Sequence, residues 1–457
     1  MSALAHAMQA LRRVEPIRLT GTVAALRGLT LTVDDLPLTV GSLVRVRTFA
    51  AGRVAELPGE VVGFEGRRAV VMMLGPTAGI RPGDRVISQQ TSPTVGIGRR
   101  LLGRVINGLG QPIDGAPLPP ALAAAPISPE PLQALRRARI KAILPTGVRA
   151  MDLMTTVGRG QRMGIFAGPG VGKSTLLGMI ARRAAADVNV IALIGERGRE
   201  VREFIEESLG PEGLARSIVV VSTSDESALM RVRAAQVACA AAEHFRDQGL
   251  DVMLMIDSIT RFAHAQRQIG LAVGEPPATK GYTPSVFAAL PAILERAGAV
   301  EAAPESPAGS ITGFYTILVE GDDMTEPISD AARGILDGHV VLSRALAHRA
   351  HFPAIDVLDS ISRVASQICD PDHLAARSAV VRLMAAYREV EDLIQIGAYA
   401  QGQNPLTDAA IALKPRIDAL LQQKTGDAEA FLASRSRLLE VARDAQRLMA
   451  SPAGRRN

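Results

Sequence analysis

The first part of the chain is built from short apolar or alternating segments separated by Gly, Asp and Pro. Six such segments lie between residues 17 and 91, at 17–26, 29–33, 43–50, 59–64, 68–74 and 84–88. Short strands with frequent turn residues are typical of a small all-β barrel or sandwich. We expect an N-terminal β-barrel domain over residues 20–92, preceded by a segment 1–19 in which residues 2–16 could form a short amphipathic helix.

The pattern changes after residue 92. Residues 107–131 are rich in Pro, Gly and Ala and predict an irregular connector. Continuous apolar runs then appear, with helix-length segments between the first four; they lie at 162–168, 188–196, 217–224, 252–257 and 313–321. Strands that are apolar on both faces and alternate with helices indicate a mostly parallel sheet covered on both sides. We expect an α/β domain over 93–365.

Helices are predicted within and after this sheet. The candidates in the α/β part are 173–185, 199–208 and 225–247. Beyond residue 365 the strand-like runs stop, and apolar residues recur at helical spacing. The fold class is therefore multi-domain, with a β-barrel, a central α/β domain and a C-terminal helical domain over 366–457.

Composition narrows the class of protein. The 457 residues are 47% hydrophobic and 21% charged, without a run of the roughly 20 apolar residues that a membrane span needs. The first residues lack the order of a secretory signal peptide, and the two cysteines have no metal-ligand spacing. We therefore expect a cytoplasmic protein. A net charge of +5, no Trp and 3% aromatic residues give no reason to expect a nucleic-acid partner.

The stretch AGPGVGKSTLL at 167–177 follows an apolar strand and opens a predicted helix. This is the context of a phosphate-binding loop, in which glycines let backbone N–H groups converge on phosphate oxygens. Lys173 would bridge the β- and γ-phosphates, and Ser174 would place its hydroxyl on a magnesium ion. Ala167 departs from the strict motif. The alternative is a glycine-rich turn with a solvated lysine. The candidate nucleotide-binding residues of the loop are Gly168, Pro169, Gly170, Val171, Gly172, Lys173, Ser174 and Thr175.

Two acidic residues follow other predicted strands of the sheet. Glu196 ends the strand 188–196, where a carboxylate can orient a water aimed at the γ-phosphate. Asp257 ends the strand 252–257 and can hold magnesium. Each has a simpler explanation, Glu196 as part of a solvated helix start and Asp257 as a helix cap. Since the carboxyl ends of parallel strands meet at one edge, Lys173, Glu196 and Asp257 together favour a nucleotide-hydrolysing site.

These motifs resemble the hexameric ATPases related to the catalytic β subunit of the rotary ATP synthase, and most closely the ATPases of flagellar and type III protein export. The resemblance covers residues 20–425. It is carried by the segments 103–115, 146–154, 167–206, 274–298, 309–344 and 352–363. It implies an ATP- and Mg²⁺-dependent hydrolase.

The resemblance also implies roles for individual residues. Glu196 aligns with the glutamate that activates the attacking water, and Arg197 with its neighbour in the motif. Asp257 matches the magnesium-side aspartate, followed by Arg261. Arg363, in DSISR, falls where the family places an arginine that reaches into the neighbouring subunit's site. Phe352 occupies the position of an aromatic residue that packs on adenine.

Finally, the resemblance implies partners and a cellular role. These are a homohexamer, a stator-like regulatory export protein bound by the N-terminal segment, export chaperones and substrates, a membrane export gate, and acidic lipid. We expect an enzyme that energises flagellar protein export, cytoplasmic but peripheral to the inner face of the membrane. The alternatives are an injectisome ATPase, a rotary ATP synthase catalytic subunit and a hexameric RNA translocase.

Overall fold

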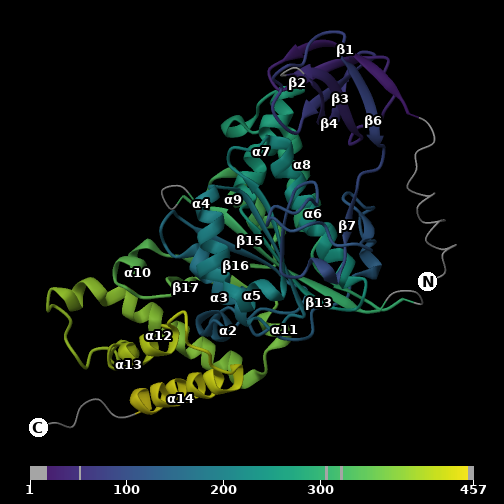
Figure 1. Ribbon diagram of the computed structural model, residues 1–457. Helices are drawn as coiled ribbons and strands as arrows, with labels where there is room; N and C mark the ends of the chain where they lie inside the picture. The colour runs from purple at the N-terminus through teal and green to yellow at the C-terminus, as the bar shows by residue number, and fades with distance from the viewer. Residues whose placement is uncertain (1–17, 51–52, 304–306, 320–322, 451–457) are drawn as a thin grey trace, which may run out of the picture.

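The computed structural model describes residues 18–50, 53–303, 307–319 and 323–450 (Figure 1). The amphipathic helix expected at 2–16 lies outside these ranges. Along the chain a β-barrel comes first, an α/β domain follows, and helices form the C-terminal part. The expected multi-domain fold class is confirmed, whereas the exact domain boundaries stay a prediction.

The N-terminal domain is a closed six-stranded barrel with the strand order β1-β2-β5-β4-β3-β6. Its strands are β1 (Thr20–Arg27), β2 (Thr30–Asp34), β3 (Leu43–Ala50), β4 (Arg53–Glu65), β5 (Arg68–Met73) and β6 (Arg85–Gln90). Alternate residues such as Val44, Val46 and Val61 point into the barrel and are fully buried. The barrel expected from the alternating segments therefore forms, and closure leaves it without a free sheet edge.

The segment after the barrel is more regular than its composition predicts. Strand β7 (Thr94–Ile97) pairs antiparallel with β9 (Ala123–Pro126), and β8 (Arg104–Asn107) joins the edge of the central sheet beside β12. We expected 107–131 to be irregular throughout. The sequence AAAP of β9 has no alternation of its own, and its strand conformation comes from pairing with β7.

The central sheet has the order β17-β16-β10-β15-β13-β11-β12-β8, with β14 paired to β15. The strands are β10 (Arg162–Ala167), β11 (Val188–Glu196), β12 (Ser217–Thr223), β13 (Asp251–Asp257), β14 (Gly298–Val300), β15 (Gly309–Leu318), β16 (Gly338–Leu342) and β17 (Ile355–Ser362). Neighbouring strands from β16 to β8 run parallel, whereas β14 and the edge strand β17 are antiparallel to their neighbours.

Helices cover both faces of this sheet, as the doubly apolar strands require. One face packs against α6 (Ala228–Arg246), α7 (Ile259–Ala272), α8 (Pro284–Leu294) and α9 (Pro327–Ile335). The other packs against α2 (Arg149–Met154) and α3 (Lys173–Arg183), with α4 (Gly198–Glu203), the π-helical turn η3 (Phe204–Leu209) and α5 (Gly210–Ala215) beside α3. Short 3-10 turns lie at Arg99–Leu101, Ala134–Arg136 and Thr279–Gly281.

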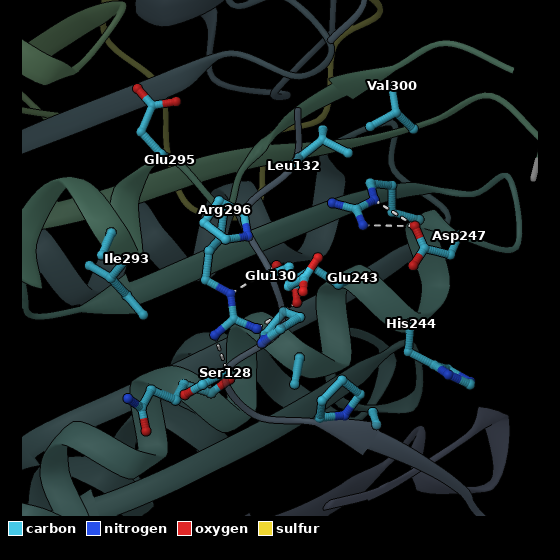
Figure 2. A pocket seen from close by; sticks show the side chains of 18 of the residues that line it. Ser128, Glu130, Leu132, Glu243, His244, Asp247, Ile293, Glu295, Arg296 and Val300 are labelled. Atoms are coloured by element: carbon cyan, nitrogen blue, oxygen red, sulfur yellow. Dashed lines mark hydrogen bonds and ion pairs between the residues drawn. The ribbon is translucent and has the colours of Figure 1, made fainter. Parts of the chain in front are cut away.

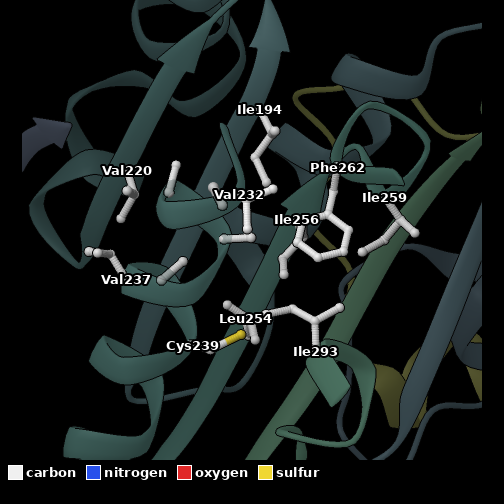
Figure 3. Packing of buried hydrophobic residues seen from close by; sticks show 14 of the residues in the cluster. Ile194, Val220, Val232, Val237, Cys239, Leu254, Ile256, Ile259, Phe262 and Ile293 are labelled. Carbon is white, nitrogen blue, oxygen red and sulfur yellow. The ribbon is translucent and has the colours of Figure 1, made fainter. Parts of the chain in front are cut away.

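The core between α6 and the sheet is tightly packed. In Figure 3, Val232 and Val237 of α6 and Phe262 of α7 lie against side chains of the central strands, including Leu254 and Ile256. Helix α6 begins where Ser227 caps it by accepting a hydrogen bond from Met230 N. This core fixes the carboxyl ends of β11 and β13, where the candidate carboxylates lie.

The C-terminal part is helical, as predicted. It consists of α12 (Pro371–Gln395), α13 (Pro405–Leu421) and α14 (Phe431–Ala450), reached from the sheet through α10 (Arg344–His348), β17 and α11 (Ala365–Ile368). The three long helices pack together and against α2. No helix within the described ranges combines the length and the apolar character needed to cross a bilayer.

Candidate functional site

The phosphate loop connects β10 to α3. Gly170 and Gly172 adopt positive φ angles of 79° and 96°, which glycine tolerates without strain. Helix α3 begins at Lys173 directly after this turn, so its unpaired N–H groups and the positive end of its dipole face the loop. The predicted strand–loop–helix context is therefore present.

A cavity of about 330 Å³ opens over this loop. It is bounded by the phosphate loop and by the carboxyl ends of β11 and β13. Its lining comprises Gly168, Pro169, Gly170, Gly172, Lys173, Ser174, Thr175, Leu193, Glu196, Glu200, Val201, Phe204, Asp257, Arg261 and Leu318. The sheet thus brings together most of the residues singled out from the sequence.

Lys173 lies between the two carboxylates. Its Nζ is 2.5 Å from Asp257 Oδ1 and 3.4 Å from Glu196 Oε1. Burial alone lowers the pKa of Lys173, but the attraction of Asp257 and Glu196 outweighs it, so the pKa is raised and the ammonium keeps its charge. Thr316 Oγ1 donates to the same Asp257 oxygen at 2.6 Å and orients this carboxylate.

Glu196 is partly withdrawn from water. Burial raises its pKa to about 7, with Lys173 opposing the shift and Asp257 adding to it. A carboxylate with a pKa near neutrality is suited to accept a proton from a bound water at working pH. The geometry and the pKa of Glu196 therefore agree with a general base.

Arg261 approaches Glu196 from α7, with its Nε 3.5 Å from Glu196 Oε1. Gly195, with φ 71°, makes room for it, because a Cβ at this position would lie 2.8 Å from Arg261 Cδ. The buried Nε of Arg261 makes no hydrogen bond within the described part of the chain. Among the described residues the Nε therefore has only the long ion pair with Glu196, and the guanidinium contributes positive charge to the wall of a cavity suited to an anionic ligand such as a phosphate.

Other predicted residues lie away from the cavity. Val171 is buried beneath the loop. Arg197 points to solvent and pairs with Glu200 at 3.4 Å. Phe352 is 47% exposed and does not line the cavity; its carbonyl accepts a hydrogen bond from Gln423 N in the α13–α14 loop.

Arg363 lies two strands from β10 and at the opposite end of the strands from the phosphate loop. It follows Ser362, which pairs with Gly338, which in turn pairs with Met163 at the start of β10. The loop begins beyond Ala167, four residues along β10, a rise of about 13 Å. Arg363 Nη2 donates to Arg333 O instead, and the side chain is exposed. It cannot reach the cavity of its own chain.

Reasoning from the sequence missed several residues of the site. Glu200 of α4, four residues after Glu196, lines the cavity but was not among the predicted site residues. Thr316 and Gly195 support the carboxylate and the arginine from positions that no local motif marks. The spacing of Glu196 and Glu200 could have suggested the first; the others depend on contacts between distant segments.

A larger hollow of about 1250 Å³ lies elsewhere, between residues 124–137 and helices α6 and α8 (Figure 2). Its charged side chains largely satisfy one another. Arg296 forms a buried ion pair with Glu243, and Arg246 lies 2.7 Å from Asp247. Paired charges leave little to recognise a charged ligand, so the smaller cavity over the phosphate loop is the better candidate site.

Comparison with known proteins shows the family of this chain. Residues 147–362 match the model of the ATP synthase alpha/beta family, nucleotide-binding domain, and residues 39–89 match the beta-barrel domain of the same family. The chain belongs to the ATP synthase alpha/beta family and is an ATP-hydrolysing enzyme of that family. Residues 369–440 match the T3SS EscN ATPase C-terminal domain, so the family likeness extends past residue 425.

Within the family, this chain falls in the group of flagellar and type III secretion ATPases. It is 51% identical to the flagellum-specific ATP synthase of Treponema pallidum, with 91% of each chain covered. It is 49% identical to the type 3 secretion system ATPase of Xanthomonas euvesicatoria, over 93% of this chain and 94% of that one. The assembled ATPase EscN of enteropathogenic E. coli, solved in complex with its central stalk EscO, has a TM-score of 0.83 and 41% identity, covering 92% of this chain and 100% of EscN.

Proposed function

We propose that this chain hydrolyses ATP in a homohexameric ring and that the energy drives flagellar protein export. The observation that carries the proposal is the meeting of Lys173, Glu196 and Asp257 at one cavity, at the carboxyl ends of three parallel strands. The family likeness and the identity with a flagellum-specific relative support the cellular role.

Different residues of the cavity would bind the phosphates, neutralise their charge, hold the metal ion and activate the water. The N–H groups of the phosphate loop and the N-terminus of α3 hold the phosphates. Lys173 leaves the two carboxylates and neutralises the β- and γ-phosphate oxygens. Ser174 and Asp257, which both line the cavity, would hold Mg²⁺, and the ion would supply a positive charge to the phosphate oxygens. Glu196, released from Lys173, orients the attacking water and accepts its proton.

Arg363 would act on the neighbouring subunit. A loose phosphoryl-transfer transition state spreads negative charge over the oxygens, and an arginine supplied across an interface accelerates hydrolysis by about 10³- to 10⁵-fold. Arg363 is exposed at the end of the strands opposite its own cavity, which leaves it available to another chain. By the family resemblance, Phe352 would pack on the adenine, and Arg197, next to Glu196 in the motif, would take part in catalysis.

The wider role rests on the relatives. The assembly of EscN with a central stalk supports a ring with a regulatory partner. We further propose binding to export chaperones and substrates, a gate in the membrane and acidic lipid, with the ring cytoplasmic at the inner face of the membrane. The 49% identity with a type 3 secretion ATPase supports an injectisome as the second candidate. Expression of this chain in a strain that lacks its flagellar ATPase tests the flagellar role, which restored motility would favour. If the chain instead restores only effector secretion, in a strain that lacks its injectisome ATPase, the injectisome role is favoured.

The test of the catalytic assignment is Glu196→Gln. The amide keeps the shape of the side chain but cannot accept the proton, so we expect kcat to fall by about 10²- to 10⁴-fold with ATP affinity retained. Steady-state phosphate release and binding of a fluorescent ATP analogue measure the two quantities. Glu207→Gln, an exposed carboxylate on η3 outside the cavity, is the matched control. Turnover of Glu196→Gln close to that of the control would reject the assignment.

The test of Arg363 uses mixed rings. Rings of Arg363→Ala alone and of Glu196→Gln alone should both be nearly inactive. Mixed rings should regain activity where an Arg363→Ala subunit, whose own cavity is intact, receives Arg363 from a Glu196→Gln neighbour. Failure of the mixture to exceed the sum of the separate rings would show that Arg363 does not act in trans.

A further inference from the structure

Strand β17 lies between Phe352, proposed to pack on the adenine, and Arg363, proposed to act on the neighbouring subunit. Its first residues follow Phe352, and its last residue precedes Arg363. It is the edge strand of the sheet, paired on one side with β16. Whatever fixes the shape of β17 therefore also fixes where Arg363 is presented.

The strand contains a bulge. Ile361 pairs with His339, but the next ladder pair is Asp356 with Val341, so residues 357–360 stand opposite the single residue 340. Such insertions bend a strand and redirect the residues beyond them. Ile361 and Ser362 follow the bulge and pair with His339 and Gly338, and Arg363 comes next, with its N–H bonded to Asp337 O. The bulge therefore sets the register and direction of the last paired residues before Arg363.

The carboxylate of Asp356 organises this bulge. Its Oδ1 accepts from Leu358 N at 3.0 Å and Asp359 N at 3.3 Å, and its own carbonyl accepts from Ser360 Oγ at 2.5 Å. Ser360 Oγ in turn accepts from Val341 N at 3.0 Å, which ties the bulge to β16. Asp356 is thus the shared acceptor of the turn, and its side chain is only 12% exposed.

A single arginine from the C-terminal domain neutralises this carboxylate. Arg388 of α12 donates through Nη2 to both oxygens of Asp356, at 2.6 and 2.7 Å. Its Nη1 lies 3.7 Å from Asp359 Oδ2, so one guanidinium stands beside two carboxylates of the bulge. Helix α12 and β17 are neighbours in the fold (Figure 1). Without Arg388, Asp356 and Asp359 would repel each other and the bulge would loosen.

We propose that Arg388 is a positioning residue for Arg363: it holds the bulge of β17 closed, and the bulge aims Arg363 at the adjacent subunit. This inference rests on the proposed action of Arg363 in trans. It also connects the C-terminal helices to the catalytic interface, because a shift of α12 would move Arg388 relative to Asp356.

The first test is Arg388→Met, which keeps the apolar length of the side chain and removes its charge. Because small misplacements of a catalytic group are costly, we expect kcat to fall by about 10-fold or more, with KM and ATP-analogue affinity unchanged. Arg382→Met, an exposed arginine on the same helix, should leave kcat unchanged. Circular dichroism and ring assembly should match for the two variants. A raised KM with unchanged kcat, or equal effects of both variants, would overturn the inference.

Rescue separates positioning from general loss of structure. Adding Asp359→Asn to Arg388→Met removes one of the two repelling charges while keeping Asp356 as the acceptor of the turn. We expect kcat to recover by several-fold. A double variant no better than Arg388→Met would show that charge balance at the bulge is not what Arg388 supplies.

Mixed rings distinguish this inference from the proposed function. Arg388→Met subunits mixed with Glu196→Gln subunits should exceed the summed activity of the separate rings, because the Glu196→Gln subunit presents a well-placed Arg363 to its neighbour. If the Arg363→Ala mixture recovers and the Arg388→Met mixture does not, the inference fails and the proposed function stands. If neither recovers, action in trans fails and the inference fails with it.

Discussion

Asp152 is a buried carboxylate at the first turn of α2, held by a single tight turn of the chain. It accepts hydrogen bonds from Thr146 N, Thr146 Oγ1 and Gly147 N. Burial raises its pKa to about 6 from 3.8, and the hydrogen bonds oppose the shift without cancelling it. In the unfolded chain the group ionises at the lower value, so the charged form is less favourable in the folded protein.

This difference predicts the sign of a pH effect. Below the unfolded pKa the group is protonated in both states. As the pH rises towards 6, the unfolded chain loses its proton first, so the contribution of Asp152 to the free energy of unfolding falls by about 3 kcal/mol and then stays constant. Asp152→Asn cannot titrate. Denaturant unfolding from pH 4 to 7 measures the free energy of unfolding of both proteins. The stability of the variant relative to the wild type should rise with pH, and a difference that does not change with pH would contradict the pKa shift.

The contact between α3 and η3 depends on one glycine. A Cβ at Gly178 would overlap the carbonyl oxygen of Ser208. Alanine is favoured over glycine inside a helix by about 1 kcal/mol, but the atoms that the new Cβ would meet include the backbone of Ser208, which cannot rotate away as a flexible side chain could. The clash should therefore outweigh the helix propensity.

We predict that Gly178→Ala destabilises the protein by about 1 to 3 kcal/mol. Gly334→Ala in α9 is the matched control, since a Cβ there meets no atom within 4 Å and should stabilise by up to about 1 kcal/mol. Chemical denaturation of both variants measures the difference. Stabilisation by Gly178→Ala would mean that η3 can move away from α3.

The helices and strands around the cavity were predictable because each carries its own periodic pattern. The predicted helix 225–247 appears as α6 and 173–185 as α3, whereas 199–208 is divided into α4 and the π-helical turn η3. Strand β17 was not predicted, because its bulge and its polar residues interrupt the alternation of apolar and polar residues. The strand conformation of β17 depends on pairing with β16, which no local pattern encodes.

The residues of the site also differ in how far the sequence could predict them. The phosphate loop and the strand-end carboxylates Glu196 and Asp257 could be predicted, because a local motif and strand order place them at one edge. Arg363 and Phe352 were found only through the family resemblance, since neither lies in the cavity of its own chain. The proposed role of Arg363 depends on an assembly that a single sequence does not describe.

The barrel and the α/β domain are joined by a buried ion pair. Arg233 of α6 lies with Nη1 2.7 Å from Glu60 Oε2 of β4, and the side chains are 3% and 14% exposed. Burial raises the pKa of Glu60, although Arg233 opposes the shift. Ser227 Oγ, at the start of α6, also donates to Leu74 O after β5. The loop that leads from β12 to α6 is thus in contact with the barrel.

Removing the charge of one partner of this ion pair should destabilise the protein more than removing both charges. Arg233→Met leaves an uncompensated buried carboxylate and should cost about 3 to 5 kcal/mol, whereas adding Glu60→Gln should restore part of that loss. Unfolding by denaturant, with limited proteolysis between residues 91 and 103 as a second measurement, tests the ordering. A double variant less stable than Arg233→Met would contradict it.

The placement of Arg363 at the opposite end of the strands from its own nucleotide pocket has a consequence for the cell. If the guanidinium serves the adjacent chain, a free subunit holds ATP without consuming it, and hydrolysis begins only where copies accumulate. Newly made subunits would then not hydrolyse ATP before they assemble. Turnover would rise steeply with local concentration, so that recruitment to one place switches the enzyme on without any separate activator.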